Sequence, residues 1–169
     1  DVYKRQKLTR FSDIGLRVLM YLARESRSPS VTVAEVAVQF DVPHNHLVKV
    51  VGMLAKMGWI DAVRGRNGGI SLAVSADTLR IGSVLRVLEG DIEAIDCEGI
   101  GCRLSGDCRL RGALKLGVDA FYGAMDEYTL ADIVSGKTGE HIVMMHRNFL
   151  QDRATASVSY THLTLPTIC

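Results

Sequence analysis

The 169-residue chain has no apolar run that approaches the roughly 20 residues a membrane-spanning helix needs. Its first residues also lack the apolar stretch of a secretory signal, so we expect a cytoplasmic protein with reduced thiols and no membrane partner. With 47% apolar and 23% charged residues, it has neither the low apolar content nor the high net charge of a disordered protein. The length suits one domain with an appendage rather than two independent domains.

The net charge of +1 hides an uneven distribution of charge along the chain. Residues 1–75 carry eleven Lys or Arg against six Asp or Glu, whereas residues 76–169 carry nine against thirteen. A basic half is a candidate for binding a polyanion. Ordinary solvated surface charge explains the same counts, so the charge alone does not decide between the two interpretations.

The two ends of the chain do not continue any periodic pattern. The opening DVYKRQ and the closing SVSYTHLTLPTIC resemble translated adapter sequence. We therefore expect residues 1–6, and the last part of a C-terminal tail over 136–169, to be non-native. The native start is then expected near Lys7, and Cys169 is not expected to take part in any chemistry.

The first predicted helix is amphipathic and faces a core. Ser12 is placed to cap it, and it is expected to continue through Arg24. Its apolar residues recur at helical spacing and form one stripe. They are Ile14, Val18, Leu19 and Leu22.

Two further helices are predicted to follow closely on each other. Thr32 and Glu35 have the spacing of a capping box in front of a short second helix. After a tight connection, Pro43 suits the first turn of a third helix, which Gly58 is expected to end. Two short helices joined by a tight turn, the second with polar residues at its start, predict a helix-turn-helix.

The next segment strengthens this prediction. WIDAVRG and ISLAV are strand-like runs joined through Asn67 and Gly68, a strong hairpin signal. A basic hairpin after a recognition helix is a wing, and Arg64 and Arg66 are predicted to lie along phosphates or in a minor groove. An ordinary exposed hairpin is the alternative. Residues 7–90 are thus expected to form a winged helix-turn-helix domain that binds a double-stranded DNA operator.

The predicted DNA contacts come from the recognition helix and the wing. Asn45 can pair with adenine, and Lys49 suits phosphate or guanine. His44 and His46 are two residues apart and point to different sides of a helix, so they are not expected to bind a metal together. The full set of candidates is Pro43, His44, Asn45, His46, Lys49, Arg64, Arg66, Asn67 and Gly68.

Another short helix is expected to end at Gly90, and a glycine-containing acidic loop over 91–108 follows it. The loop contains Cys97, Cys102 and Cys108. Reducing compartments disfavour disulfides, which would also leave one thiol unpaired. A zinc site usually needs a fourth Cys or a nearby His as ligand, and neither a fourth Cys nor a His occurs between residues 90 and 140. The three thiols therefore favour an iron–sulfur cluster over zinc or a purely thiol-based switch.

An enzyme that uses the three thiols for redox or metal chemistry is the alternative from another class. Such an enzyme would need acid–base partners in a pocket, and the cysteine segment has carboxylates but no His and no phosphate-cradling loop. We therefore expect no enzymatic activity.

The segment after the cysteines is predicted to form one long amphipathic helix over 109–135. Its apolar seam follows steps of four and three: Leu110, Leu114, Val118, Phe121, Met125 and Tyr128. Such a helix commonly buries its seam against a second copy, and a twofold dimer suits a palindromic operator. The alternative is that it folds back on its own domain. The expected fold is mainly α with a small β-hairpin, a winged helix-turn-helix domain plus a long dimerisation helix.

Several motifs in this order resemble the bacterial Rrf2 family of regulators, in particular its nitric-oxide-sensing branch. They are KLTRFSDIGLRVLMYLA, PHNHLVKVVGMLAKMGWI, VRGRNGGISLA, RIGSVLRVLEG, the three cysteines and YTLADIV. The resemblance covers about residues 7–135. It implies a homodimeric transcriptional repressor that binds DNA with its iron–sulfur cluster intact and releases it when nitric oxide attacks the iron. Genes for nitric oxide detoxification are then expressed.

The resemblance also implies site residues. Cys97, Cys102 and Cys108 correspond to three thiolate ligands, and Asp13 to a fourth ligand supplied across the dimer. Regulators of the iron–sulfur or redox-responsive IscR type place a His three residues after the third cysteine, where this chain has Arg111. That departure counts against the IscR type without excluding it. A [4Fe-4S] and a [2Fe-2S] cluster both remain open.

Overall fold

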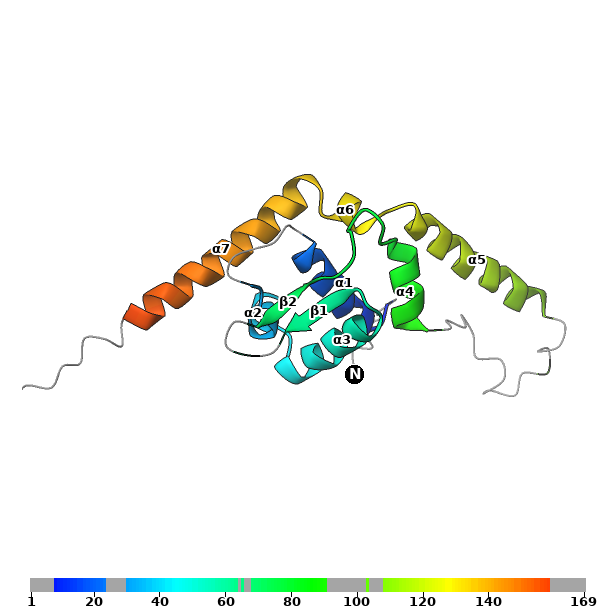
Figure 1. Cartoon of the computed structure of the whole chain (residues 1–169). Coiled ribbons are helices and arrows are strands. Elements are labelled where there is room, and N and C mark those ends of the chain that lie inside the picture. Colours follow the sequence, from blue (N-terminus) through cyan, green and yellow to red (C-terminus); the bar gives the residue numbers. More distant parts are fainter. Residues whose placement is uncertain are drawn as a thin grey trace, which may run out of the picture.

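The structure is a computed structural model that describes residues 8–23, 30–63, 65, 68–90, 103 and 108–158. Its helices are α1 (Arg10–Leu22), α2 (Val33–Gln39), α3 (His44–Lys56), α4 (Ile81–Glu89), α5 (Arg109–Asp126), α6 (Leu130–Ile133) and α7 (Gly136–Val158). Its strands are β1 (Ile60–Val63) and β2 (Gly69–Leu72). Figure 1 shows α1 to α4 and the hairpin gathered in a central body, from which α5 and α7 extend in opposite directions.

The core-facing stripe of α1 is confirmed, but its N-cap is not the residue that the sequence suggested. Thr9 caps the helix, and its hydroxyl accepts a hydrogen bond from the Ser12 N–H at 3.2 Å. Ser12 lies buried in the first turn instead. The Thr9 and Ser12 hydroxyls both precede the apolar stripe. The Thr9 hydroxyl is the one close enough to accept a hydrogen bond from a first-turn N–H that has no partner within the helix.

The helix-turn-helix forms over α2 and α3. Thr32 caps α2 by accepting from the Glu35 N–H at 3.1 Å. Asp41 turns the chain with a positive φ of 49°, and Pro43 stands at the N-cap of α3. Gly58 follows α3 with a φ of +72°, a conformation that glycine adopts without strain, and so marks the predicted stop.

The two strands pair antiparallel, with Ile60 opposite Leu72 and Val63 opposite Gly69. Ile60 and Ile70 point into the core. Gly69 lies against the segment before α2, and a Cβ there would meet the Val31 carbonyl oxygen at 2.7 Å. The hairpin is therefore held against the helical body.

The α5 helix packs along α4 through its second half. Tyr122 is buried there, and the Arg86 guanidinium lies 4.9 Å from the centre of its ring. Arg86 also pairs with Asp126, and this hydrogen bond lowers the pKa of the Asp126 carboxyl below its usual value. Gly82 permits the close approach, because a Cβ at this position would collide with the Tyr122 carbonyl oxygen.

The long helix expected over 109–135 is shorter than the periodicity suggested. It ends at Asp126, and Thr129 starts α6 with a capping box in which Asp132 is the second member. Tyr128, the last residue of the predicted seam, therefore lies between two helices. The cause is local: the bonds to Thr129 satisfy a new helix start and lower the pKa of Asp132.

The region expected as a C-terminal tail contains the 23-residue helix α7. Ile142 is buried against the body, and the Gln39 side-chain amide of α2 donates to the Met145 carbonyl at 3.0 Å. Among the described residues, no helix combines the length and apolar character needed to cross a membrane.

Candidate DNA-binding surface and cluster region

The predicted base-contacting residues lie at the exposed start of α3. Pro43, His44, Asn45, His46 and Lys49 are all exposed. The Asn45 side-chain oxygen accepts a hydrogen bond from the His46 N–H at 3.0 Å. Pairing of this amide with adenine would therefore require that the oxygen exchange this local bond for one with the base.

The helical geometry of α3 adds three residues that the sequence reasoning missed. The buried face is formed by Leu47, Val50, Val51 and Leu54. Opposite this face, Val48, Gly52 and Lys56 are exposed and continue the line from Asn45 and Lys49. Val48 offers an apolar contact of the kind that a thymine methyl group takes, and Gly52 has open space around it. Counting steps of three and four from Asn45 would have found all three.

The wing is described at its base. The strands place the hairpin next to the end of α3, as Figure 1 shows. Gly68 is half-buried, and its N–H donates to the Gly65 carbonyl at 2.9 Å. Arg64, Arg66 and Asn67 lie outside the described residues.

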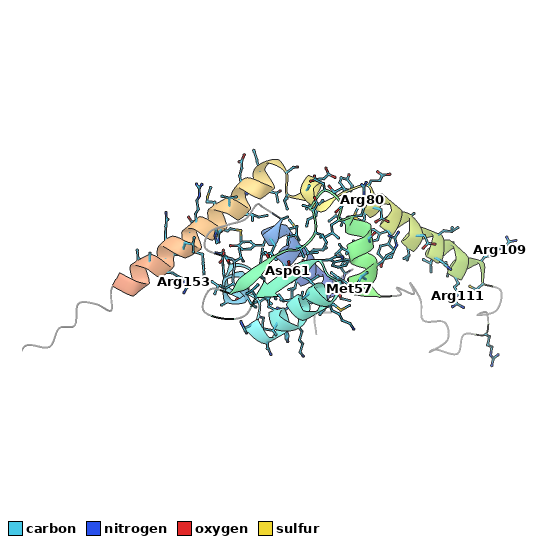
Figure 2. All side chains as sticks on the ribbon, in the orientation of Figure 1. Met57, Asp61, Arg80, Arg109, Arg111 and Arg153 are labelled. Carbon is cyan, nitrogen blue, oxygen red and sulfur yellow. The ribbon has the colours of Figure 1, made fainter. Side chains whose placement is uncertain are left out.

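Cys108 is the candidate ligand that the structure describes in the cysteine region. It is a partly exposed free thiol at the N-cap position of α5. Figure 2 shows Arg109 and Arg111, which follow Cys108 in sequence, at the end of α5 that is farthest from the body. Cys97 and Cys102 lie outside the described residues. Among those that are described, no three His, Cys, Asp or Glu side chains gather closely enough to hold a metal ion.

Asp13 lies in the first turn of α1, where its carboxylate accepts from Arg17 Nε at 2.9 Å. The two side chains are 43% and 48% exposed, so the pair itself stabilises the fold little. The Arg17 guanidinium lies 5.9 Å from the ring centre of Phe40, at the end of α2. Phe40 in turn packs edge-on against Tyr21. These contacts connect Asp13 with the turn of the helix-turn-helix.

The start of α1 is also bonded to the end of α4. Glu89 accepts from the Thr9 backbone N–H at 2.8 Å and from its hydroxyl at 3.1 Å. Glu89 is the last residue of α4, directly before Gly90 and the cysteine segment. The start of α1, one turn before Asp13, is therefore bonded to the end of α4, which the cysteine segment follows in sequence.

Residues 8–136 match the family model for Rrf2, described as an iron-dependent transcriptional regulator. The chain belongs to the Rrf2 family. Among solved structures, Staphylococcus aureus CymR in its oxidized form has a TM-score of 0.62 at 23% identity, covering 78% of this chain and 98% of that one. T. potens IscR has a TM-score of 0.61 at 22% identity, covering 77% and 87%.

A third structure, CymR (YrzC) of B. subtilis, described as its global cysteine regulator, has a TM-score of 0.53 at 26% identity. It covers 77% of this chain and 97% of that one. These similarities confirm the predicted fold, a mostly helical winged-helix domain with a two-stranded hairpin. As a member of the Rrf2 family, the chain is a transcriptional regulator.

Proposed function

We propose that this regulator is a homodimeric repressor of the NsrR type, which binds its operator with an iron–sulfur cluster in place and releases it when nitric oxide reacts with the cluster. The observation that carries the proposal is the trio of thiols in the segment that joins the DNA-binding body to α5. The description of the family as iron-dependent supports iron as the metal partner of these thiols. The regulated genes would be those for nitric oxide detoxification.

The proposed DNA contacts are of two chemical kinds, contacts to base edges and contacts to phosphates. Asn45 and Val48, near the start of α3, suit base edges in the major groove. Lys49 and Lys56 suit phosphates, which supply most of the affinity and none of the sequence preference. Arg66, which lies between β1 and β2 in sequence, is proposed to contact a neighbouring phosphate or minor groove.

One exposed side of α5 offers a face for a second copy of the chain. Leu110 and Phe121 are 59% and 41% exposed, and they lie on one side of the helix with Ala113 and Gly117. Small residues beside large apolar ones let two helices approach closely. Tyr122, on another side of the same helix, packs on α4, so we assign the dimer contact to the exposed face formed by Leu110, Ala113, Gly117 and Phe121.

The donor set suits an iron–sulfur cluster. Thiolates are the usual ligands of such clusters, and Cys108 is a free thiol. The Asp13 carboxylate is held by an exposed guanidinium, a partner that it can exchange for a metal. When bound, the cluster supplies iron atoms that a small molecule can attack. A carboxylate is a harder and more labile iron ligand than a thiolate, which would leave one iron open to such attack.

The chain's own residues then connect ligand state with DNA binding. If Asp13 leaves Arg17 to serve as a ligand, the guanidinium over Phe40 loses its carboxylate partner. Phe40 ends α2, directly before the turn into α3. A change at Asp13 would thus reach the recognition helix through two side-chain contacts. Arg111, in place of the IscR-type histidine, favours the nitric oxide branch over the IscR type.

Anaerobic purification followed by iron, sulfide and absorbance analysis tests the proposal. We expect a coloured protein that contains iron and sulfide. Cys97→Ala, Cys102→Ala and Cys108→Ala should each abolish stable cluster binding and specific DNA affinity, whereas Cys169→Ala should change neither. A colourless, zinc-loaded protein would contradict the proposal, and turnover of a substrate by the holoprotein would favour an enzyme.

A further inference from the structure

A buried carboxylate links the helix-turn-helix to the C-terminal helix. Glu35, in the first turn of α2, is 1% exposed, and His146 of α7 is 5% exposed. Glu35 Oε1 accepts from the Tyr21 hydroxyl of α1 at 2.6 Å and lies 2.5 Å from His146 Nδ1. The consecutive helices α1 and α2 and the distant helix α7 therefore meet at one oxygen atom.

This arrangement departs from the local role that the sequence gave to Glu35. A glutamate at this position of a capping box usually reaches back to the N-cap backbone. Here the Glu35 backbone donates to Thr32, while its side chain turns into the core. A buried carboxylate is costly unless it is paired and hydrogen-bonded, so Glu35 depends on His146 and Tyr21.

A second bond ties the same two helices together. Gln39, in the last turn of α2, donates to the Met145 carbonyl of α7. With only seven residues, α2 is too short to hold its position by its own hydrogen bonds. The α7 helix therefore holds α2 at both ends, and α2 packs directly against the recognition helix.

We propose that His146 and Glu35 are positioning residues for operator recognition, because α7 seated on this pair sets the place of α2 and thereby of α3. The family model match ends at residue 136, where α7 begins, so Glu35 lies within the matched region and His146 lies beyond it. The inference rests on the proposed DNA-binding function. It makes α7 a part of the structure that recognises DNA. Any change that detaches α7 from α2 then lowers the affinity for the operator.

The test compares full-length holoprotein variants on a duplex that the wild-type protein selects from a random library, and on an unrelated duplex. His146→Ala should speed amide exchange around Met145 and lower affinity for the selected duplex by about tenfold or more, with little loss on the unrelated duplex. Arg147→Ala, an exposed neighbour on α7, is the matched control and should behave like the wild type.

A double variant separates positioning from the cost of an unpaired buried charge. Glu35→Gln with His146→Ala removes that charge, so the unfolding temperature should return toward the wild-type value. Positioning predicts that α7 still exchanges fast and that affinity for the selected duplex stays low. His146→Gln, which keeps a donor, should restore part of that affinity.

Wild-type affinity in the double variant, with α7 still exchanging fast, would overturn the inference, because α2 would then read DNA without α7. The same conclusion follows if His146→Ala releases α7 and binds the selected duplex normally. If the single variant fails to fold, the double variant and His146→Gln still decide whether α7 positions α2 for operator binding. If the wild-type protein selects no duplex at all, the proposed function fails and the inference falls with it.

Discussion

Asn45 stands in the line of exposed residues on α3 that would meet base edges, and Lys56 stands farther along the same line. Asn45→Ala should lower affinity for the selected duplex by about 1–3 kcal/mol, the worth of one bidentate base contact. Its affinity for unrelated DNA should stay near the wild-type value. Binding titrations on both duplexes at several salt concentrations measure this.

Lys56→Ala is the matched comparison, because a phosphate contact carries no sequence information. It should weaken binding to both duplexes alike and reduce the steepness of the salt dependence. If Asn45→Ala also weakened both duplexes alike, Asn45 would be a backbone contact and the assigned reading face would be wrong.

Replacement of Asp13 tests whether its carboxylate is a ligand of the cluster. Asp13→Ala should leave the dimer intact while the cluster absorbance decays several times faster in the presence of an iron chelator, because one ligand is lost. Affinity for the selected duplex should fall even before nitric oxide is added. An unchanged decay rate and unchanged DNA affinity would remove Asp13 from the site, although the three thiolates would survive that result.

At the residue scale, sequence reasoning was sound where the cause is local. Gly58 ends α3, and Thr32 caps α2, because each depends on residues within one helical turn. The sequence misplaced the cap of α1, since Thr9 and Ser12 both carry hydroxyls and only the folded geometry shows which one accepts the first-turn N–H. It missed the role of Glu35 entirely, because its partner His146 is 111 residues away.

At the scale of elements, the crossing of α4 and α5 depends on Gly82. Gly82→Ala should destabilise the fold by about 1–3 kcal/mol, because the new methyl group meets backbone that cannot rotate away. Gly123→Ala is the control, since nothing lies within 4 Å of its Cβ. It should be neutral or slightly stabilising, because alanine favours helix. Denaturant unfolding compares them, and equal losses would contradict the assigned contact.

The lengths of α5 and α7 could not be predicted from the spacing of apolar residues alone. The seam of apolar residues continues in sequence past Asp126, yet the bonds between Thr129 and Asp132 start a new helix. That signal was readable, because the two residues have the spacing of a capping box. The α7 helix has few regularly spaced apolar residues, and it docks through the buried Ile142 together with the polar contacts of Gln39 and His146.

At the scale of the whole molecule, α5 is proposed to join two copies. Phe121→Asp should convert the dimer to a monomer in sedimentation velocity, because it places a charge in the apolar face. It should also weaken binding to a palindromic duplex. Leu116→Asp is the matched control: Leu116 is 71% exposed on the same helix, away from the face formed by Leu110 and Phe121. Dissociation by both variants, or by neither, would contradict the assigned face.

The two candidate sites differ in how far the structure describes them. The recognition helix was predicted in place and in orientation, because its buried stripe leaves one possible exposed face. The cysteine segment was predicted from chemistry, and its first two thiols lie outside the described residues. The proposed connection between the sites runs through Asp13, Arg17 and Phe40. The Asp13–Arg17 pair has i,i+4 spacing within α1, but the contact of Arg17 with Phe40 crosses to the end of α2 and required the three-dimensional structure.

The central claim is that cluster chemistry controls operator binding. The most direct measurement titrates nitric oxide anaerobically into the iron-loaded protein while following both cluster absorbance and affinity for the selected duplex. We predict that the absorbance is lost and that affinity falls in parallel, by about tenfold or more, while Cys108→Ala binds the selected duplex weakly from the start and does not respond. Operator affinity that stays constant while nitric oxide destroys the cluster would contradict the account.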